Sequence, residues 1–398
     1  MATYKEQNKL NVPHLRFPEF HGEWEKCKLG DIATLTKGSG ISKDQRSATG
    51  TPCILYGELY TTYKSEVIDY VVSKTDISDK NLVRSCANDI IIPSSGETAI
   101  DISTARCVLS PDVLLGGDLN IIRLKDGDGR FFSYQLNGVR KYDIAKIAQG
   151  VSVVHLYGES IKGLTVSFPS NKEQQKISTL LSLIDERIAT QSKLIEKLES
   201  LIKGISNKLF NSKEGMPVRL GAVLKERSEK TKVNNQYTVL SSTVNGLFSQ
   251  REYFSKDIAS ENNVGYKIIR LHDVVLSPQN LWMGNINYND KFDIGIVSPS
   301  YKIFFISNNF DKRYVAAMLK THRALYGYKL ISEQGASVVR RNLNLEAFEQ
   351  LIFKIPTIDK QQEIGKTISL LNSQLETERT LKATYQSQKQ YLLRQMFI

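Results

Sequence analysis

ISTLLSLIDERIATQSKLIEKLESLIKGISNKLF, residues 177–210, repeats its apolar side chains in alternating steps of four and three residues. The ten positions on this face are Ile177, Leu181, Ile184, Ile188, Gln191, Ile195, Leu198, Ile202, Ile205 and Leu209. Nine of them are apolar, and Gln191 is the polar exception. This spacing is the heptad seam of a coiled coil. Pro169 and Ser170 are typical of a helix start, and no proline follows up to residue 216. We therefore predict a helix over 172–210, about 58 Å long.

A second, less regular seam ends the chain. Its apolar members are Ile364, Ile368, Leu371, Leu375, Leu392 and Met396. Glu378, Lys382, Tyr385 and Lys389 occupy the seam positions between them. Polar residues at a seam cost stability but fix register and orientation. We expect the two helices to pair in antiparallel orientation; the alternative is an ordinary helical hairpin that is packed on a core and acts as scaffold.

The second half of the chain repeats phrases of the first half. QGVSVV at 149–154 returns as QGASVV at 334–339, and FPSNKEQQKI at 168–177 returns as IPTIDKQQEI at 355–364. The spacing between the two copies of each phrase is too long for a solenoid unit. The repeat therefore indicates two similar domains, each followed by a similar helix. The predicted segments are an N-terminal segment 1–22, domain one 23–168, a spacer helix 169–212, domain two 213–355 and a second spacer helix 356–398.

Both domains are rich in short apolar runs with β-branched residues, such as NDIIIP and HDVVLS, which are typical of strands. Residues 131–149 and 311–332 have helical patterns. The predicted fold class is α+β: two similar domains joined by two long antiparallel helices that form a coiled coil, with an internal pseudo-two-fold repeat. This connectivity returns Phe397–Ile398 to the N-terminal segment NVPHLRFPEF, residues 11–20.

The composition favours a polyanionic partner. The 398 residues carry a net charge of +11, and the pI is about 9.2, which suits nucleic acid; the alternative is a basic protein without such a partner. Cys27, Cys53, Cys86 and Cys107 are too widely spaced for a typical zinc site. The polar N-terminus and the lack of a long apolar run indicate a cytoplasmic protein with reduced thiols and no membrane contact.

No convincing active site is visible in the sequence. The glycine-rich cofactor loop and the N/D-P-P-Y/F box of a DNA methyltransferase are missing. KGSGISK at 37–43 is weak as a dinucleotide loop, and GKT at 365–367 lacks the upstream glycine of a phosphate loop. His155, His272 and His322 stand alone, so we expect neither catalytic nor metal-binding residues in this chain.

The repeated helix opening, [FI]-P-x(3–4)-[EK]-Q-Q-x-I, after a QGxSV phrase resembles the specificity subunits of type I restriction–modification systems. The opening stretch NVPHLRFPEFHGEWEKCKLGDIATLTKG is also similar to the start of such subunits. The resemblance covers essentially the whole chain, and its helix openings are its most specific part. The domains match the family in layout more than in sequence.

The resemblance implies that each domain is a target recognition domain, which reads one half of a split double-stranded DNA sequence, and that the helices set the gap. It implies two modification subunits, which bind S-adenosylmethionine and methylate adenine at N6. It also implies two restriction subunits, which use ATP and Mg²⁺ and cut DNA. The chain itself would be a non-catalytic, cytoplasmic bacterial protein without a cofactor of its own. Two similar reading domains explain why the QGxSVV phrase occurs twice.

Candidate DNA contacts lie in loops after predicted strands and in the repeated phrase. They are Lys37, Ser39, Lys43, Ser94, Ser95, Gly150, Ser152, His155, Gln279, Asn280, Gly335, Ser337, Arg340 and Arg341. Paired arginines suit guanine edges or phosphates, and Gln or Asn suits adenine. A solvated loop, a plain turn and loop capping are the structural alternatives for these residues.

Two other functions compete with this interpretation. A stand-alone endonuclease or methyltransferase would show activity in the isolated chain. A structural adaptor with incidental charge would show no salt-dependent binding to DNA.

Overall fold

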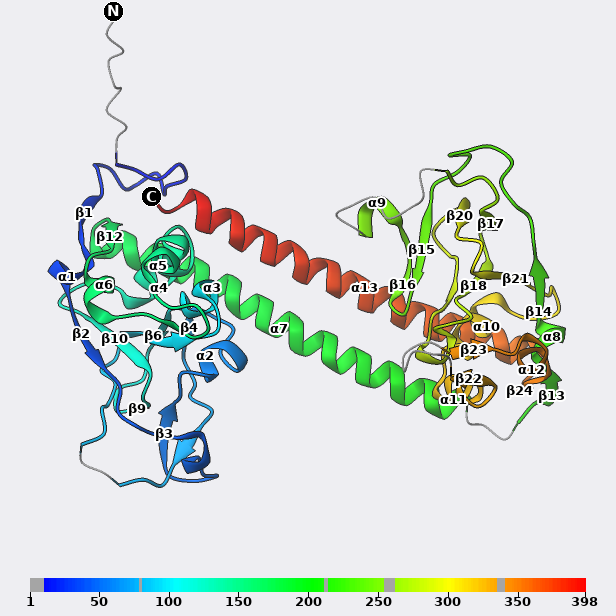
Figure 1. Ribbon diagram of the computed structural model, residues 1–398, viewed down its shortest axis with the longest axis horizontal. Coiled ribbons are helices and arrows are strands. Elements are labelled where there is room, and N and C mark those ends of the chain that lie inside the picture. The colour runs from blue at the N-terminus through cyan, green and yellow to red at the C-terminus, as the bar shows by residue number, and fades with distance from the viewer. Residues whose placement is uncertain (1–10, 79–80, 211–213, 254–261, 335–340) are drawn as a thin grey trace, which may run out of the picture. The chain divides into compact units, whose positions relative to one another are not determined.

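The chain forms two compact units in the computed structural model, which describes residues 11–78, 81–210, 214–253, 262–334 and 341–398. The first unit comprises Met1–Ser192 and Thr380–Ile398, and the second comprises Lys193–Arg379. Two long helices, α7 (Asn171–Phe210) and α13 (Ile358–Gln395), contribute to both units (Figure 1). The helix that the sequence predicts over 172–210 is confirmed, and so is the α+β class.

The first unit is built on a five-stranded sheet with the order β2-β10-β6-β8-β4. Its strands are β2 (Ala33–Lys37), β10 (Leu119–Leu124), β6 (Asp89–Pro93), β8 (Arg106–Val108) and β4 (Val67–Ile68). The run DIIIP makes β6 apolar on both faces, and every residue of this central strand is buried. An unbroken apolar run fits a strand covered on both sides.

Smaller strand groups and short helices surround this sheet. The strand groups are β1 (Glu25–Lys28) with β12 (Thr165–Phe168), β7 (Ser95–Gly96) with β11 (Val154–His155), and β5 (Lys74–Thr75) with β3 (Thr51–Ile54) and β9 (Leu114–Leu115). The helices are α1 (Leu29–Ile32), η1 (Lys43–Gln45), α2 (Glu58–Thr61), α3 (Ala99–Ile102), α4 (Gly129–Asn137), α5 (Lys141–Ile147) and α6 (Gly158–Lys162).

The second unit repeats this plan around a four-stranded sheet with the order β14-β21-β18-β19. Its strands are β14 (Leu224–Arg227), β21 (Lys302–Ile306), β18 (Asp273–Leu276) and β19 (Ile286–Tyr288). The pairs around it are β13 (Met216–Arg219) with β24 (Ile352–Ile355), β15 (Leu240–Thr243) with β16 (Gly246–Ser249), β17 (Lys267–Arg270) with β20 (Ile294–Val297), and β22 (Ser332–Gln334) with β23 (Arg341–Leu343). The helices are α8 (Leu220–Val223), α9 (Gln250–Tyr253), η2 (Leu281–Met283), α10 (Lys312–Met318), α11 (His322–Leu330) and α12 (Leu345–Gln350).

A buried glutamine ties each long helix to its unit. In the first unit, the Gln174 side chain donates to the Pro169 carbonyl at 2.8 Å and accepts from the Asp128 amide at 2.9 Å. In the second unit, Gln361 makes the same two bonds, to the Pro356 carbonyl at 2.9 Å and from the Asp311 amide at 3.0 Å. Asp128 and Asp311 cap α4 and α10. The repeated proline and first glutamine of the helix openings therefore join a strand end, a long helix and a helix cap.

The two units differ where the long helix crosses this cap. Ser178 of α7 donates its hydroxyl to the Asp128 carboxylate at 2.6 Å. Its counterpart in the second copy of the repeat is Gly365, where a Cβ atom would lie 2.4 Å from Asp311 Oδ1. The glycine of the GKT sequence thus allows a close helix contact.

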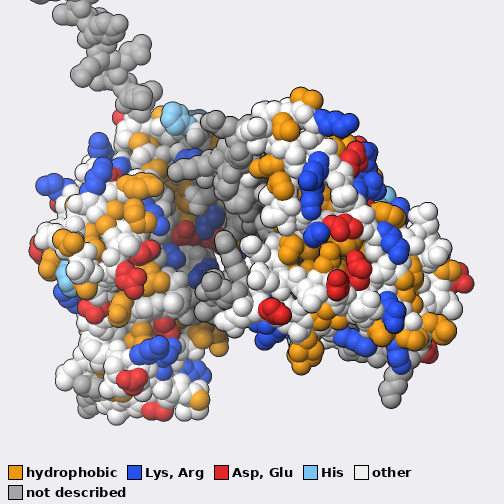
Figure 2. All heavy atoms as spheres, turned by 45° about the vertical axis from the view of Figure 1, so that its right-hand side comes forward, with side chains coloured by type: hydrophobic (Ala, Val, Ile, Leu, Met, Phe, Trp, Pro, Cys, Tyr) orange, Lys and Arg blue, Asp and Glu red, His pale blue; other side chains and the backbone are white. Residues whose placement is uncertain are grey.

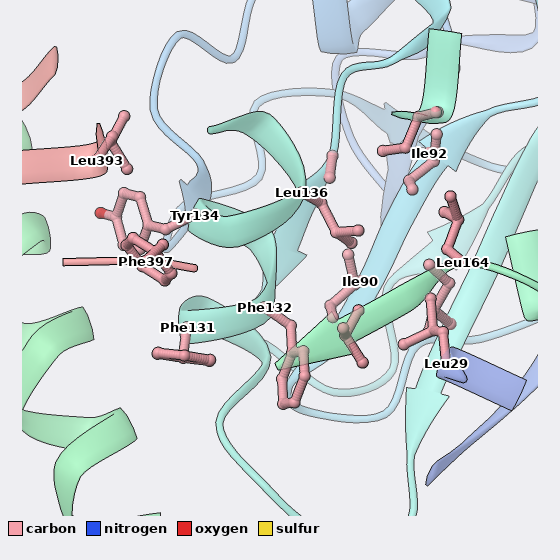
Figure 3. Packing of buried hydrophobic residues seen from close by; sticks show 14 of the residues in the cluster. Leu29, Ile90, Ile92, Phe131, Phe132, Tyr134, Leu136, Leu164, Leu393 and Phe397 are labelled. Carbon is pink, nitrogen blue, oxygen red and sulfur yellow. The ribbon is translucent and has the colours of Figure 1, made fainter. Parts of the chain in front are cut away.

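The C-terminal end of α13 belongs to the core of the first unit. Phe397 and Leu393 point toward Tyr134 and Phe131 of α4 (Figure 3). The Leu15 amide donates to the Gln395 carbonyl at 2.8 Å. The expected return of the chain end to the N-terminal segment is confirmed (Figure 1).

Seam side chains at the ends of both helices pack into the two cores. Ile177, Leu181, Ile184, Leu392 and Met396 are buried in the first unit, and Ile195, Ile364, Ile368 and Leu375 are buried in the second. Ile188, Leu198, Ile202, Ile205, Leu209 and Leu371 are half-buried. Within the first unit Asp185 contacts Lys389 and Arg187 lies over Tyr385; within the second Glu199 pairs with Arg379. Rising numbers on α7 meet falling numbers on α13, so the two helices are antiparallel within each unit.

Lys389 is the charged centre of a buried network in the first unit. Its ammonium donates to the carboxylates of Glu66 and Asp185. Tyr134 and Ser65 donate to Asp185 at 2.8 and 3.0 Å. A buried lysine between two carboxylates holds one arrangement of α7, α13 and the domain, because a shift of either helix would leave a buried charge unpaired.

We predict that Gln174→Ala lowers the free energy of unfolding by about 3 kcal/mol, because it leaves a buried carbonyl and a buried amide without partners. Urea unfolding of the full chain measures this loss. The matched control is Gln175→Ala, which removes an exposed side chain from the next position. Equal stability of the two variants would contradict the bridging role of Gln174.

Candidate nucleic-acid interface

The first QGxSVV phrase forms a tight hairpin at the surface of the first unit. The Gln149 amide donates to the His155 carbonyl at 2.9 Å, and the His155 amide donates back to Gln149 at 2.7 Å. Gly150 has a φ of 118°, and a Cβ atom there would lie 2.1 Å from the Val153 carbonyl oxygen. Only glycine fits this turn without strain, which explains why the phrase contains a glycine. We call residues 149–155 the recognition hairpin, after the DNA-recognition role that the sequence resemblance implies for this phrase.

The loop after the central strand β6 lies beside the recognition hairpin. In the pairing of β7 with β11, Ser95 faces His155 and Gly96 faces Val154. The Leu156 amide donates to the Ser94 carbonyl at 3.0 Å. The structure thus brings Ser94 and Ser95 to the recognition hairpin, although the two segments lie far apart in the sequence.

The candidate DNA contacts in and beside the recognition hairpin differ in solvent exposure. Gly150, Ser152 and His155 are exposed. Ser94 is buried, and its hydroxyl lies 3.4 Å from the Asp118 carboxylate. The Ser95 side chain is half-buried. The hairpin tip therefore offers backbone, hydroxyl and imidazole groups to a ligand, whereas Ser94 holds the loop in place.

The segment Lys37–Lys43 lies against the same sheet. Lys37 ends β2 opposite Asn120, whose side chain donates to the Leu156 carbonyl at 2.9 Å. The Ser39 hydroxyl accepts from the Val83 amide at 2.7 Å and so holds the loop. Lys37 and Lys43 are exposed, and no carboxylate pairs with either among the residues that the structure describes.

The second unit has a corresponding arrangement. Gln334 pairs with Arg341 across β22 and β23, and the Arg341 amide donates to the Gln279 carbonyl at 3.1 Å. The loop after β18 thus bonds to Arg341, which follows the second phrase, whereas the loop after β6 pairs with the end of the first phrase itself. Gly335, Ser337 and Arg340 lie outside the described residues. The Arg341 guanidinium donates to the carbonyl and hydroxyl of Ser332, at 2.6 and 2.9 Å, and so stabilises its own hairpin.

A polar network that the sequence did not reveal adjoins this loop. The Asn285 amide donates to the Asn280 carbonyl at 3.2 Å, and the Asn285 side chain bonds to Ser242. Ser242 accepts in turn from Asn287, which receives a bond from the Lys320 ammonium at 2.7 Å. Because these residues come from separate strands and a helix end, no local sequence pattern announces the network.

The described residues show neither a metal centre nor a membrane helix. No group of three or more His, Cys, Asp or Glu side chains in this part of the chain is placed to hold a metal ion. Burial raises the pKa of the Cys53 thiol to about 11, so this cysteine stays protonated. Among the described helices none has the length and apolar character needed to span a membrane. Lys and Arg side chains are spread over the visible face of the second unit (Figure 2).

Comparison with known proteins shows what this chain is similar to. Residues 21–200 match the family model described as the type I restriction modification DNA specificity domain. The resemblance to the specificity subunits of type I restriction–modification systems is thereby confirmed.

The chain is 26% identical over 217 residues to the specificity subunit of the type I restriction enzyme MjaVIII from Methanocaldococcus jannaschii, which covers 53% of this chain and 46% of that protein. The chain spans about half the length of the curated relatives it matches.

Among solved structures, the S subunit of a type I restriction–modification system from M. genitalium superposes with a TM-score of 0.65 at 17% identity, over 97% of this chain and 99% of that one. A chain from a study of complex assembly and conformational transition in a type I system superposes with a TM-score of 0.50 at 11% identity, over 93% and 96% of the two chains. At these identities the likeness concerns the fold.

We predict that Gly150→Ala loosens the recognition hairpin, because the added Cβ atom would collide with the Val153 carbonyl. Hydrogen exchange measured by mass spectrometry should become faster in peptides that cover 149–156. The control is Gly158→Ala, since a Cβ atom at Gly158 would meet no atom nearer than 3.8 Å. Unchanged exchange in the Gly150 variant would show that the turn does not need glycine.

Proposed function

We propose that this chain is the DNA specificity subunit of a type I restriction–modification complex, and that each unit reads one half of a bipartite double-stranded target. The observation that carries the proposal is the recurrence of one surface device. In the first unit, the loop after β6 pairs with the end of the repeated phrase. In the second unit, the loop after β18 bonds to Arg341, which follows the repeated phrase. Two related devices in one chain suit a target made of two separate words.

The basic charge supports DNA as the ligand. The net charge of +11 supplies the attraction to phosphates that all duplex-binding proteins need. The exposed candidates Ser152 and His155, with Lys37 and Lys43, supply donors for base edges and phosphates. Gln279 is exposed at the corresponding loop of the second unit.

The outward faces of the long helices support docking of two modification subunits. Leu183 and Leu370 occupy the same position in the two copies of the repeat and are 51% and 61% exposed. Leu194 and Leu381 correspond in the same way and are 39% and 37% exposed. Single exposed leucines are ordinary, but the same leucines at both copies of the repeat favour one partner bound twice. We call these four residues the paired leucines.

The chain supplies recognition, and its partners supply chemistry. In this proposal S-adenosylmethionine binds to the modification subunits, and ATP and Mg²⁺ bind to two restriction subunits. Continuous helix from Asn171 to Phe210 sets the number of unread base pairs between the two words.

We predict a split methylation motif. The chain is expressed with its modification subunit in a host without DNA methylation, and N6-methyladenine is mapped by long-read sequencing. Two short words around a fixed gap are expected, because two reading devices are held by one spacer. A continuous motif, or methylation that persists when this chain is omitted, would contradict the proposal.

We further predict that Leu183→Asp or Leu370→Asp removes one modification subunit from the complex, because a charge in the apolar contact is costly to bury. Native mass spectrometry counts the bound subunits. The control is Ala189→Asp, which places the same charge on another exposed position of α7. Two bound subunits in both leucine variants would exclude the paired leucines as the docking surface.

A further inference from the structure

Three lysines of the second unit lie near one another. They are Lys230, Lys267 and Lys302, which we call the lysine cluster. Lys230 lies directly opposite Lys267 in an antiparallel bridge. Like charges at directly opposed positions destabilise a sheet, so this arrangement needs a compensating interaction.

The protein itself supplies little compensation. The Lys302 ammonium pairs with Glu226 at 2.7 Å. The Lys267 ammonium donates to the Tyr301 carbonyl at 2.6 Å, and only 9% of this residue is exposed. In the described part of the chain, no carboxylate pairs with Lys230 or Lys267. Three positive charges thus share one carboxylate.

The electrostatic environment of Lys267 shows the same excess of positive charge. Burial lowers the pKa of Lys267, and the positive charges of Lys302 and Lys230 lower it further, against the opposing effect of Glu226. An anion beside the cluster would remove this repulsion. A DNA backbone, with one charge per about 1.7 Å of helix axis, provides several.

The internal repeat places Lys230 where the first unit also carries a lysine. Lys230 follows β14, as Lys43 follows β2. The two strands have equivalent surroundings: Leu29 and Leu220 precede them, and the Leu29 and Leu220 amides donate to the Leu164 and Leu351 carbonyls, both at 2.8 Å. Both units therefore carry lysines after the same strand, although the intervening sequences differ.

We propose that the lysine cluster binds phosphates of the target duplex and positions the second unit on its half of the DNA. The inference rests on the proposed function, which it deepens. Phosphate contacts fix register without reading sequence. The cluster should therefore contribute to affinity and leave the identity of the methylated words unchanged.

The test uses the full chain in complex with its modification subunits and a labelled duplex that carries the mapped target. Binding is measured by fluorescence anisotropy between 50 and 200 mM salt for the wild type and for Lys230→Gln, Lys230→Arg and Lys291→Gln. Lys291 is an exposed lysine in the loop between β19 and β20, at the other end of the β17–β20 pair, and provides a matched change of charge.

Lys230→Gln should weaken binding to target and non-target duplexes by the same factor. The slope of log affinity against log salt should fall in magnitude by about 0.9, so the ratio of wild-type to variant affinity falls by about 3.5-fold over this fourfold range of salt. Lys230→Arg should restore both quantities, and Lys291→Gln should change neither. The methylated motif should stay the same.

Two results would overturn the inference while the proposed function stands. The Lys230→Gln complex could bind DNA with the affinity and salt slope of the wild type, or its binding could be weakened for the target sequence alone. Loss of a modification subunit from the Lys230→Gln complex, seen by native mass spectrometry, would assign the cluster to a protein contact and also overturn it. A wild-type complex that binds no duplex would overturn the inference and the proposed function together.

Discussion

A buried side-chain amide at the start of each long helix is the interaction on which the rest of the structure depends. Gln174 satisfies one carbonyl and one amide that would otherwise be buried without partners, and Gln361 makes the same two bonds to partly buried groups. Each glutamine thereby fixes the direction in which a 38- to 40-residue helix leaves its domain. A small error at this joint would be magnified along the helix, so the proposed spacing of two DNA words would require a rigid joint.

The first unit is completed by the far end of the chain. Phe397 packs against Trp24 and Phe131, and Lys389 pairs with carboxylates of the domain and of α7. Buried ion pairs add little net stability but penalise every misaligned state. The C-terminal helix is therefore structural support for the first unit as well as the proposed spacer, and the polar seam residue Lys389 explains how one register is chosen.

The helices and the duplication were predictable from the sequence because both are periodic: the seam from Ile177 to Leu209 keeps a heptad spacing, and the QQ opening at 174–175 returns at 361–362. The roles of single residues were less predictable, because they depend on contacts between distant segments. Ser94 and Arg341 have the chemistry of DNA contacts, yet Ser94 bonds to Asp118 and Arg341 to Ser332. The opposed pair of Lys230 and Lys267 depends on strand register, which no local pattern reveals.

The central claim is that one chain reads DNA twice with two independent units. The most direct test replaces residues 23–168 by the matching domain of another specificity subunit and maps N6-methyladenine in a host without other methylation. Our account predicts that one word of the motif changes while the other word and the gap remain. A change in both words, or in neither, would contradict the assignment of one word to each unit.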